Sequence, residues 1–143
     1  MRPGRRGDVG YKIGVALTEI GGGAGMNIRP PAGETWRVIS WRATYTTDAT
    51  VLNRRMVWHI YDGTNFASTW GSNIAQAASL SYVYVANPCT RNDGILVTPY
   101  VMMPWDMNIF VDNTWYWFID PDGTQAGDHF SQGYAYVEKW LDE

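Results

Sequence analysis

The amino-acid composition and the spacing of turn residues predict an all-β protein. Val (11), Ile (9), Thr (12) and the aromatic residues (21) total 53, whereas Leu, Glu, Gln and Lys together total 14. Branched and ring side chains pack well on pleated strands but lose rotamer freedom in helices. Short alternating segments are separated by Gly, Pro, Asn and Asp along the chain, as in sandwiches. We therefore expect an antiparallel β-sandwich of the jelly-roll type with an extended N-terminal arm.

The length of 143 residues fits a single domain. We assign residues 26–143 to the sandwich and residues 1–25 to a flexible basic arm that contains one strand and a Gly-rich hinge. Apolar alternation predicts the arm's strand at 11–20, and the hinge is Gly21 to Gly25. The arm residues expected to bind a partner are Arg2, Arg5, Arg6, Tyr11, Ile13, Val15 and Leu17.

The arm has two interpretations. In the first, the strand at 11–20 adds to a neighbouring subunit's sheet while the arginines pair with carboxylates beyond it. In the second, it folds back as an edge strand of its own sandwich.

The sandwich strands are predicted from alternation and from the turns between them. In 34–47 the alternation changes phase between Val38 and Ile39, which indicates a β-bulge or a strand buried on both faces. In 50–61, the predicted core face carries Leu52, Met56, Trp58 and Ile60, and the predicted polar face carries Asn53, Arg55 and His59. A helical turn is expected only in 71–79. The strands are expected at 34–47, 50–61, 66–70, 80–86, 94–103, 107–111, 114–120 and 132–141.

Residues for catalysis are sparse, and we expect the protein not to be an enzyme. The sequence contains two histidines, His59 and His129, and neither has a recognisable catalytic context. We interpret both as ordinary surface histidines. Cys89 is a single cysteine and is expected to be a lone thiol. No cofactor is expected.

A calcium site is the one metal site that the sequence suggests. Asp120, Asp122 and Asp128 carry oxygen ligands of the kind that calcium accepts, but the spacing departs from the EF-hand pattern. Asp-Pro-Asp-Gly is also turn chemistry in its own right, and we favour that interpretation. We expect no metal ion to be required for folding.

Aromatic residues are the informative excess of this sequence. Eight Trp, nine Tyr and four Phe exceed what one small core readily buries. We expect Trp105, Trp115 and Trp117 to contribute to a subunit interface, where aromatic residues act as anchors. Burial within the subunit and a platform for stacking sugar rings are the two alternatives.

The charge distribution favours self-association. Residues 1–60 carry nine Arg and Lys against four acids, a balance of +5, and residues 61–143 carry two against ten, a balance of -8. Unlike patches on neighbouring copies attract, so we expect a homo-oligomer, with a trimer as the first guess. The net charge of -3 argues against nucleic acid as a partner. No apolar run approaches the roughly 20 residues that span a bilayer, so we expect no membrane partner.

One segment resembles a known class of proteins. The stretch Ile28-Arg29-Pro30-Pro31-Ala32-Gly33-Glu34-Thr35-Trp36-Arg37-Val38, with Ile60-Tyr61-Asp62-Gly63-Thr64-Asn65 further on, is similar to small β-sandwich structural proteins in the virions of tailed bacteriophages. The resemblance implies a capsid decoration or cement protein, a head fibre or a tail component, located in the virion. Its partners would be copies of itself and other virion proteins such as a major capsid protein. The alternative is a carbohydrate-binding module or tail adhesin that holds a glycan.

Overall fold

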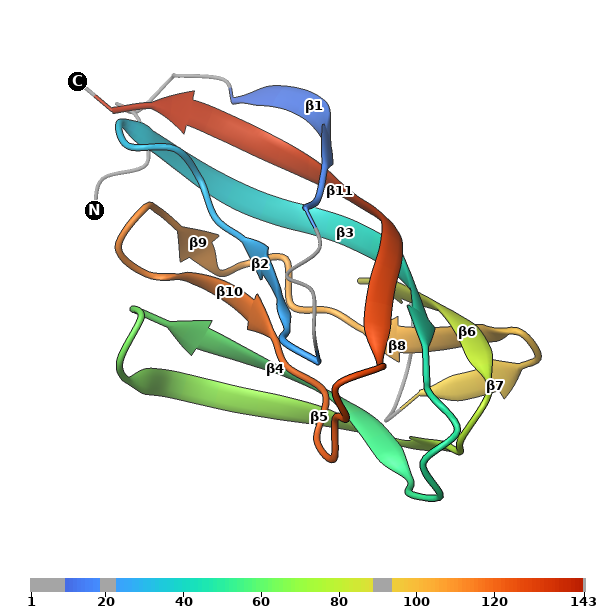
Figure 1. The fold of residues 1–143 in the computed structure, drawn as a ribbon. Coiled ribbons are helices and arrows are strands. Elements are labelled where there is room, and N and C mark those ends of the chain that lie inside the picture. The colour runs from blue at the N-terminus through green and yellow to red at the C-terminus, as the bar shows by residue number, and fades with distance from the viewer. Residues whose placement is uncertain (1–9, 19–22, 89–93, 143) are drawn as a thin grey trace.

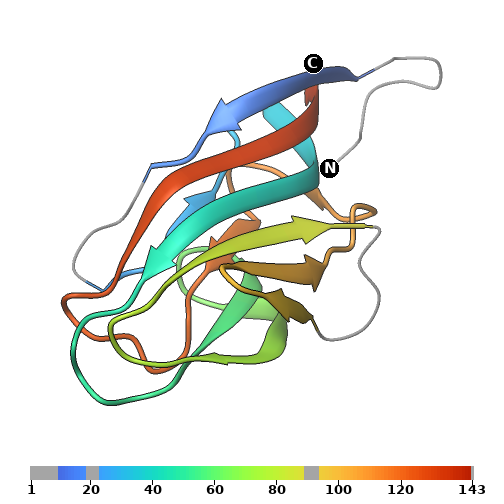
Figure 2. The same cartoon turned by 90° about the vertical axis from the view of Figure 1, so that its right-hand side faces the viewer.

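The computed structural model describes residues 10–18, 23–88 and 94–142. Within these ranges the chain forms two β-sheets and no helix, so the expected all-β fold is confirmed. The two sheets lie face to face in Figure 1, and Figure 2 shows the strands of the larger sheet side by side. No helix in the described ranges is long and apolar enough to cross a membrane.

The larger sheet has seven strands. Six follow the order β1-β11-β3-β6-β8-β7, and β9 pairs with the beginning of β3 on the edge opposite β11, the edge that β6 occupies further along. All neighbours are antiparallel except β6 and β8, which are parallel. The strands are β1 (Tyr11–Ala16), β3 (Glu34–Thr46), β6 (Ser81–Asn87), β7 (Ile95–Val97), β8 (Tyr100–Pro104), β9 (Phe110–Val111) and β11 (His129–Leu141).

The smaller sheet has four antiparallel strands in the order β2-β10-β4-β5. They are β2 (Met26–Ile28), β4 (Arg54–Tyr61), β5 (Phe66–Gln76) and β10 (Tyr116–Ile119). Sequence alternation did not predict the three-residue strand β2. The expected helical turn in 71–79 is wrong, because residues 71–76 continue β5 and pair with β4 as far as Gln76.

A β-bulge in β3 explains the change of alternation phase at Val38 and Ile39. Val137 and Tyr136 are consecutive on β11, but they pair with Val38 and Ser40 on β3, so Ile39 has no partner in the register. The bulge keeps Val38 on the core face although the alternation shifts, and Trp41 is buried on the same side. The predicted bulge is confirmed.

The core lies between the sheets and receives side chains from both. Met26, Trp58 and Ile119 of the smaller sheet are buried in the same cluster as Trp41 and Val137 of the larger sheet. Aromatic rings fill much of this space. The burial of Met56 and Trp58 confirms the core face predicted for 50–61, although Leu52 lies exposed outside it.

The N-terminal strand belongs to the molecule's own sheet, which is the second of the two interpretations. Residues 11–16 pair antiparallel with β11, from Tyr11 opposite Lys139 to Ala16 opposite Tyr134 (Figure 1). Ile13 and Val15 pack against the core, as does Leu17. This apolar burial and the pairing with β11 hold β1 in place. Arg2, Arg5 and Arg6 lie outside the described residues, as does Cys89.

Candidate functional site

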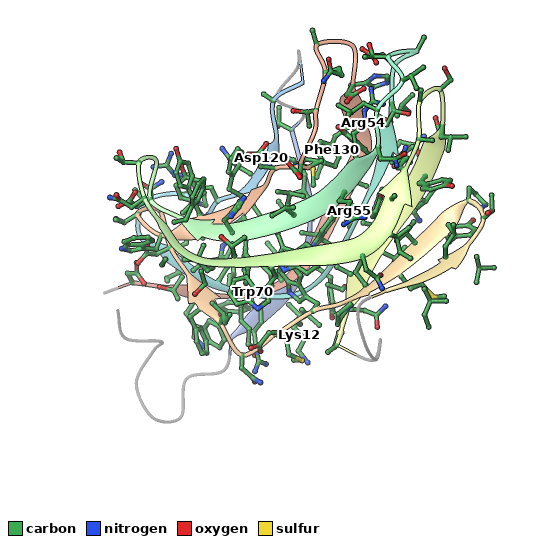
Figure 3. The ribbon with its side chains drawn as sticks, turned by 90° about the horizontal axis from the view of Figure 1, so that it is seen from below. Lys12, Arg54, Arg55, Trp70, Asp120 and Phe130 are labelled. Carbon is green, nitrogen blue, oxygen red and sulfur yellow. The ribbon has the colours of Figure 1, made fainter. Side chains whose placement is uncertain are left out.

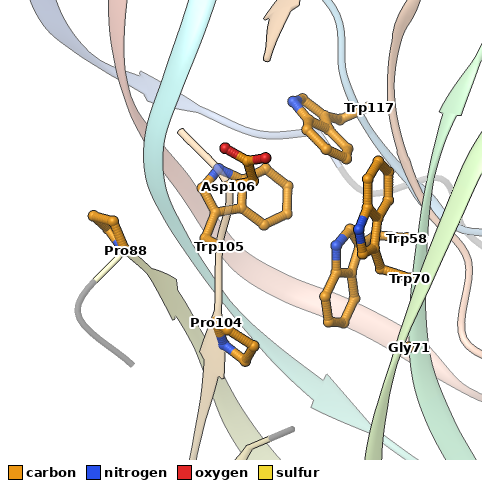
Figure 4. Close-up of a pocket in the computed structure, with 8 residues that line it drawn as sticks. All are labelled: Trp58, Trp70, Gly71, Pro88, Pro104, Trp105, Asp106 and Trp117. Atoms are coloured by element: carbon orange, nitrogen blue, oxygen red, sulfur yellow. The ribbon is translucent and has the colours of Figure 1, made fainter. Parts of the chain in front are cut away.

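A pocket rich in tryptophan lies between the two sheets (Figure 4). Three of the tryptophans belong to the smaller sheet: Trp58 lies on β4, Trp70 on β5 and Trp117 on β10. Strands β4 and β10 are central in this sheet, and β5 is an edge strand. Trp105 follows β8 directly and closes the pocket from the larger sheet. The cavity measures about 490 Å³, within the range of small-molecule sites. We call it the tryptophan pocket; its lining is Trp58, Trp70, Gly71, Pro88, Pro104, Trp105, Asp106 and Trp117.

The four indole rings of the tryptophan pocket pack at large angles to one another. The ring centroids of Trp105 and Trp117 are 4.4 Å apart with planes at 48°, and those of Trp70 and Trp117 are 5.3 Å apart at 52°. Trp58 and Trp105 meet at 6.2 Å and 39°. Neighbouring rings are therefore in contact with one another, and Trp58, Trp105 and Trp117 belong to the core cluster as well as to the pocket wall.

Polar groups in the tryptophan pocket are few. Nε1 of Trp105 donates a hydrogen bond of 2.9 Å to the carbonyl oxygen of Val38, which fixes the ring. Nε1 of Trp117 is buried without a hydrogen-bond partner in the described part of the chain. The Asp106 carboxylate is exposed and accepts a hydrogen bond of 2.9 Å from the backbone N–H of Asn108. One negative charge therefore accompanies four aromatic rings.

The three tryptophans expected at a subunit interface are not exposed together. Trp105 and Trp117 are 5% and 1% exposed, and only Trp115 is half-buried, in the turn before β10. Trp105 and Trp117 belong to the core cluster between the sheets, which corresponds to the alternative of burial within the subunit and not to the expected subunit interface. Strand alternation separates two faces but does not say which one the other sheet covers.

An apolar area lies on the outer face of the larger sheet, at its β7 end. The pairing register aligns Val83, Tyr100 and Val97 in one row across β6, β8 and β7. It aligns Val85, Met102 and Ile95 in the next row. Ile95, Val97 and Tyr100 are 48%, 57% and 49% exposed, and the other three are half-buried. We call these six residues the outer apolar patch. Sequence alternation missed it, because the run 94–103 looks like one ordinary strand.

The β7 edge of the outer apolar patch is also open. Among the residues that the structure describes, no strand pairs with the far side of β7. An exposed apolar edge strand is a template for pairing with another chain. Contiguous exposed apolar surface commonly marks a protein interaction site.

A buried ion pair holds together the loops at one end of the sandwich (Figure 3). Arg54 is fully buried, and its Nε lies 2.9 Å from Oδ2 of Asp128. Its Nη2 donates to Asp48 at 2.7 Å, and its Nη1 donates to the carbonyl oxygens of Thr50 and Leu52. All of these partners lie in loops or at strand ends, so this network is structural. Strand alternation places Arg54 on the same face as Met56 and Trp58 and places Arg55 on the opposite face, where it is exposed.

Asp128 is the acidic centre of this network. Burial alone would raise the pKa of Asp128, but hydrogen bonds from Arg54 and from the backbone N–H groups of Asp48 and Gln125 outweigh it and lower the pKa. The Tyr45 hydroxyl also donates to Oδ2 of Asp128. Asp128 is therefore occupied by protein donors. Within the described ranges, no three His, Cys, Asp or Glu residues are grouped to hold a metal ion.

His59 is not the surface residue that its position suggested. It is 8% exposed, and its ring stacks on Phe66 with centroids 4.1 Å apart. Nδ1 of His59 lies 2.8 Å from the hydroxyl of Thr69, and the ring centroid of Phe118 lies 6.1 Å from that of His59. A second aromatic layer therefore covers the outer face of the smaller sheet. Burial lowers the pKa of His59 below its ordinary value of 6.5, against a smaller opposing effect of Asp120.

Replacing His59 by glutamine is expected to flatten the pH dependence of stability between about pH 7 and about pH 5. In this pH window His59 becomes protonated in the unfolded chain, whereas in the folded chain its lowered pKa keeps it neutral to a lower pH. The unfolded state then binds more protons, so the wild-type protein loses stability as the pH falls. Chemical denaturation at several pH values measures the slope.

The matched control for this experiment is His129→Gln, because His129 is exposed. It should keep the wild-type slope. Equal slopes for His59→Gln and the wild type would contradict the effect assigned to His59 burial.

Comparison with family models, with curated proteins and with solved structures finds no match to this chain.

Proposed function

We propose that this chain is a structural protein of a tailed bacteriophage virion, of the capsid decoration or cement type, that assembles with copies of itself and with other virion subunits. The outer apolar patch carries the proposal. It presents six apolar side chains over three strands beside an open strand edge, and self-association would remove both from water. The resemblance of the segment from Ile28 to Val38 to phage virion proteins supports the virion part of the proposal.

The strand order supports a jelly-roll arrangement. Strands β1, β11, β3 and β6 lie in one sheet and β2, β10, β4 and β5 in the other, and β7 to β9 are inserted between β6 and β10. Apart from the β4–β5 hairpin, consecutive strands among these eight lie in opposite sheets. Two interlocked Greek keys produce this order, and such double sheets occur in viral capsid and lectin domains. This is support by analogy of fold.

The basic segment before β1 is proposed to contact a second type of subunit. Arg2, Arg5 and Arg6 precede an edge strand whose first residue, Tyr11, is 66% exposed. Arginine forms bidentate hydrogen bonds with carboxylates. The proposed partner surface is an acidic area on a neighbouring virion protein such as a major capsid protein.

Replacing Val97 by aspartate is expected to lower the solution mass from that of the oligomer towards the monomer mass of 16.2 kDa. A charge in the outer apolar patch would have to lose its hydration on assembly. Light scattering after size-exclusion chromatography measures the mass, and a trimer would give about three times the monomer value.

Val51→Asp is the matched control, because Val51 is a 95% exposed valine in a loop outside the outer apolar patch. It should keep the wild-type mass. A wild-type protein that is monomeric at high concentration would overturn the self-association part of the proposal.

The virion part has a separate test. Antibodies raised against the purified protein should label intact phage particles, in electron micrographs, from the source of the sequence. Absence of label from particles that carry the gene would overturn the virion assignment, whatever the oligomeric state. Binding to a glycan array by a monomeric protein would instead favour the carbohydrate-binding alternative.

A further inference from the structure

We propose that the outer face of the larger sheet binds an acidic oligosaccharide, one that contains uronic acid units, across strands β1, β11 and β3. Two exposed tyrosines on β11 and two exposed cations on the flanking strands form the site. Because it shares no residue with the outer apolar patch, this site is independent of the assembly function. We call it the tyrosine face; its residues are Lys12, Gly14, Ser40, Arg42, Tyr134 and Tyr136.

The pairing register places the two tyrosines between the flanking strands. Tyr136 pairs with Gly14 on β1 and with Ser40 on β3. Tyr134 pairs with Arg42 on β3. The alternate residues of β1 and β11 pack against the core, so the tyrosine face is turned to solvent. Figure 2 shows β1, β11 and β3 side by side.

The rings of the tyrosine face are open. Tyr134 and Tyr136 are 50% and 43% exposed, and within the described ranges neither ring stacks on another aromatic ring. The ring of Tyr134 occupies the space that a side chain at Gly14 would need, since a Cβ atom there would lie 2.6 Å from its Cε1 and Cζ. An exposed tyrosine offers an apolar ring with a hydroxyl at its end. This combination suits the apolar C–H face and the hydroxyl groups of a pyranose.

Charge defines the class of sugar. Lys12 and Arg42 are exposed, and neither forms an ion pair in the part of the chain that the structure describes. Glu138 lies opposite Lys12 in the register, but its carboxylate is paired with Arg37. Two positive charges on this face are therefore left uncompensated. Lysine and arginine form charge-assisted hydrogen bonds with carboxylates, which a uronic acid supplies.

The spacing of the two cations favours a chain of sugar units over a single small anion. Lys12 and Arg42 are separated in the register by two strand spacings and four residues, which amounts to about 17 Å. One carboxylate cannot contact both. A chain with carboxylates on several of its units contacts both and crosses the tyrosine rings between them.

A protein and a nucleic acid fit the tyrosine face less well. The buried centre of a protein interface is apolar, and none of the six residues of the tyrosine face is a branched aliphatic. Nucleic-acid binding relies on many phosphate contacts, whereas the described residues of this face supply two unpaired cations. The hydroxyls of Ser40 and of the two tyrosines both donate and accept, as sugar hydroxyls require.

Titration calorimetry of the full chain with oligogalacturonate, with oligoguluronate and with hyaluronan fragments tests the proposal. At least one should bind. Its carboxyl-reduced form has a hydroxymethyl group in place of each carboxylate and should bind about fivefold more weakly, the loss expected from two exposed ion pairs. Absence of binding by every probe, or equal binding of the reduced form, would overturn the acidic-sugar site. Equally tight binding of polyglutamate or of single-stranded DNA would overturn it in favour of unspecific attraction between charges.

Two substitutions locate the binding. Tyr134→Ser removes an open ring and should weaken binding about fivefold or more. Tyr11→Ser is its control, because Tyr11 is 66% exposed on β1 but alternates to the other side of that strand. Arg42→Gln should weaken binding of the acidic oligosaccharide and leave that of the reduced form unchanged, whereas Arg55→Gln, on the smaller sheet, should change neither. Unchanged affinity in Tyr134→Ser or in Arg42→Gln would overturn the assignment.

A third variant removes none of the proposed contacting side chains. The added methyl group of Gly14→Ala displaces the ring of Tyr134, so affinity should fall while the melt stays cooperative. Gly71→Ala is the matched control, since a Cβ atom at Gly71 would meet nothing closer than 3.7 Å. Equal affinity of the two variants would contradict the role of the Tyr134 ring position. The solution mass of every variant should stay that of the wild type, and a lower mass for Tyr134→Ser would overturn the sugar site in favour of an assembly surface.

Discussion

Replacing Arg54 by methionine is expected to lower the free energy of unfolding by about 3–5 kcal/mol. Methionine fills similar space but leaves Asp128 buried without its cationic partner, together with the carbonyl oxygens of Thr50 and Leu52. An uncompensated buried charge is the costly product of breaking such a pair. Urea denaturation followed by tryptophan fluorescence gives the free energy.

Arg55→Met is the matched control for Arg54→Met. Arg55 is the next residue of β4 and is exposed, so its loss should change stability by less than about 0.5 kcal/mol. Similar losses for the two variants would show that the buried network does not have the stabilising role assigned to it.

The ion pair between Arg54 and Asp128 also makes the free energy of unfolding depend on pH in the acidic range. The pKa of Asp128 is lower in the folded than in the unfolded chain, so its ion pair stabilises the protein above the unfolded value. That stabilisation is lost as the pH falls through the lowered pKa. Because Arg54 is a main cause of the lowered value, Arg54→Met should show a weaker loss of stability in acid than the wild type.

Removing residues 1–18 is expected to lower the free energy of unfolding by about 2–4 kcal/mol. Ile13, Val15 and Leu17 are each half-buried against the core, and full burial of such side chains contributes about 1.5–3 kcal/mol each. The deletion also leaves the backbone of β11 without its neighbour on one side. Thermal and urea melts of the truncated protein test this.

A shorter truncation separates folding from attachment. Removal of residues 1–9 retains β1 and deletes Arg2, Arg5 and Arg6, so the melt should match that of the full chain while binding to the phage particle is lost. An unchanged melt after removal of residues 1–18 would contradict the structural role of β1. Unchanged particle binding after removal of residues 1–9 would contradict the proposed role of the arginines.

The sequence by itself determined the all-β class and the positions of most strands. Alternation has a period of two residues and can be read within a single segment. This is why the core positions Met56 and Trp58 were predicted correctly. The bulge at Ile39 was predicted for the same reason, since a change of phase is visible in the strand that contains it.

Only the tertiary structure decided which segments pair and which faces are covered. The run 94–103 divides into β7 and β8, and β8 pairs in parallel with β6, which no local pattern indicates. Long-range pairing also placed β1 on β11, assembled the tryptophan pocket from four segments and brought Asp128 to Arg54. Each outcome depends on the loop or strand that covers a residue, and that neighbour lies far away in the chain.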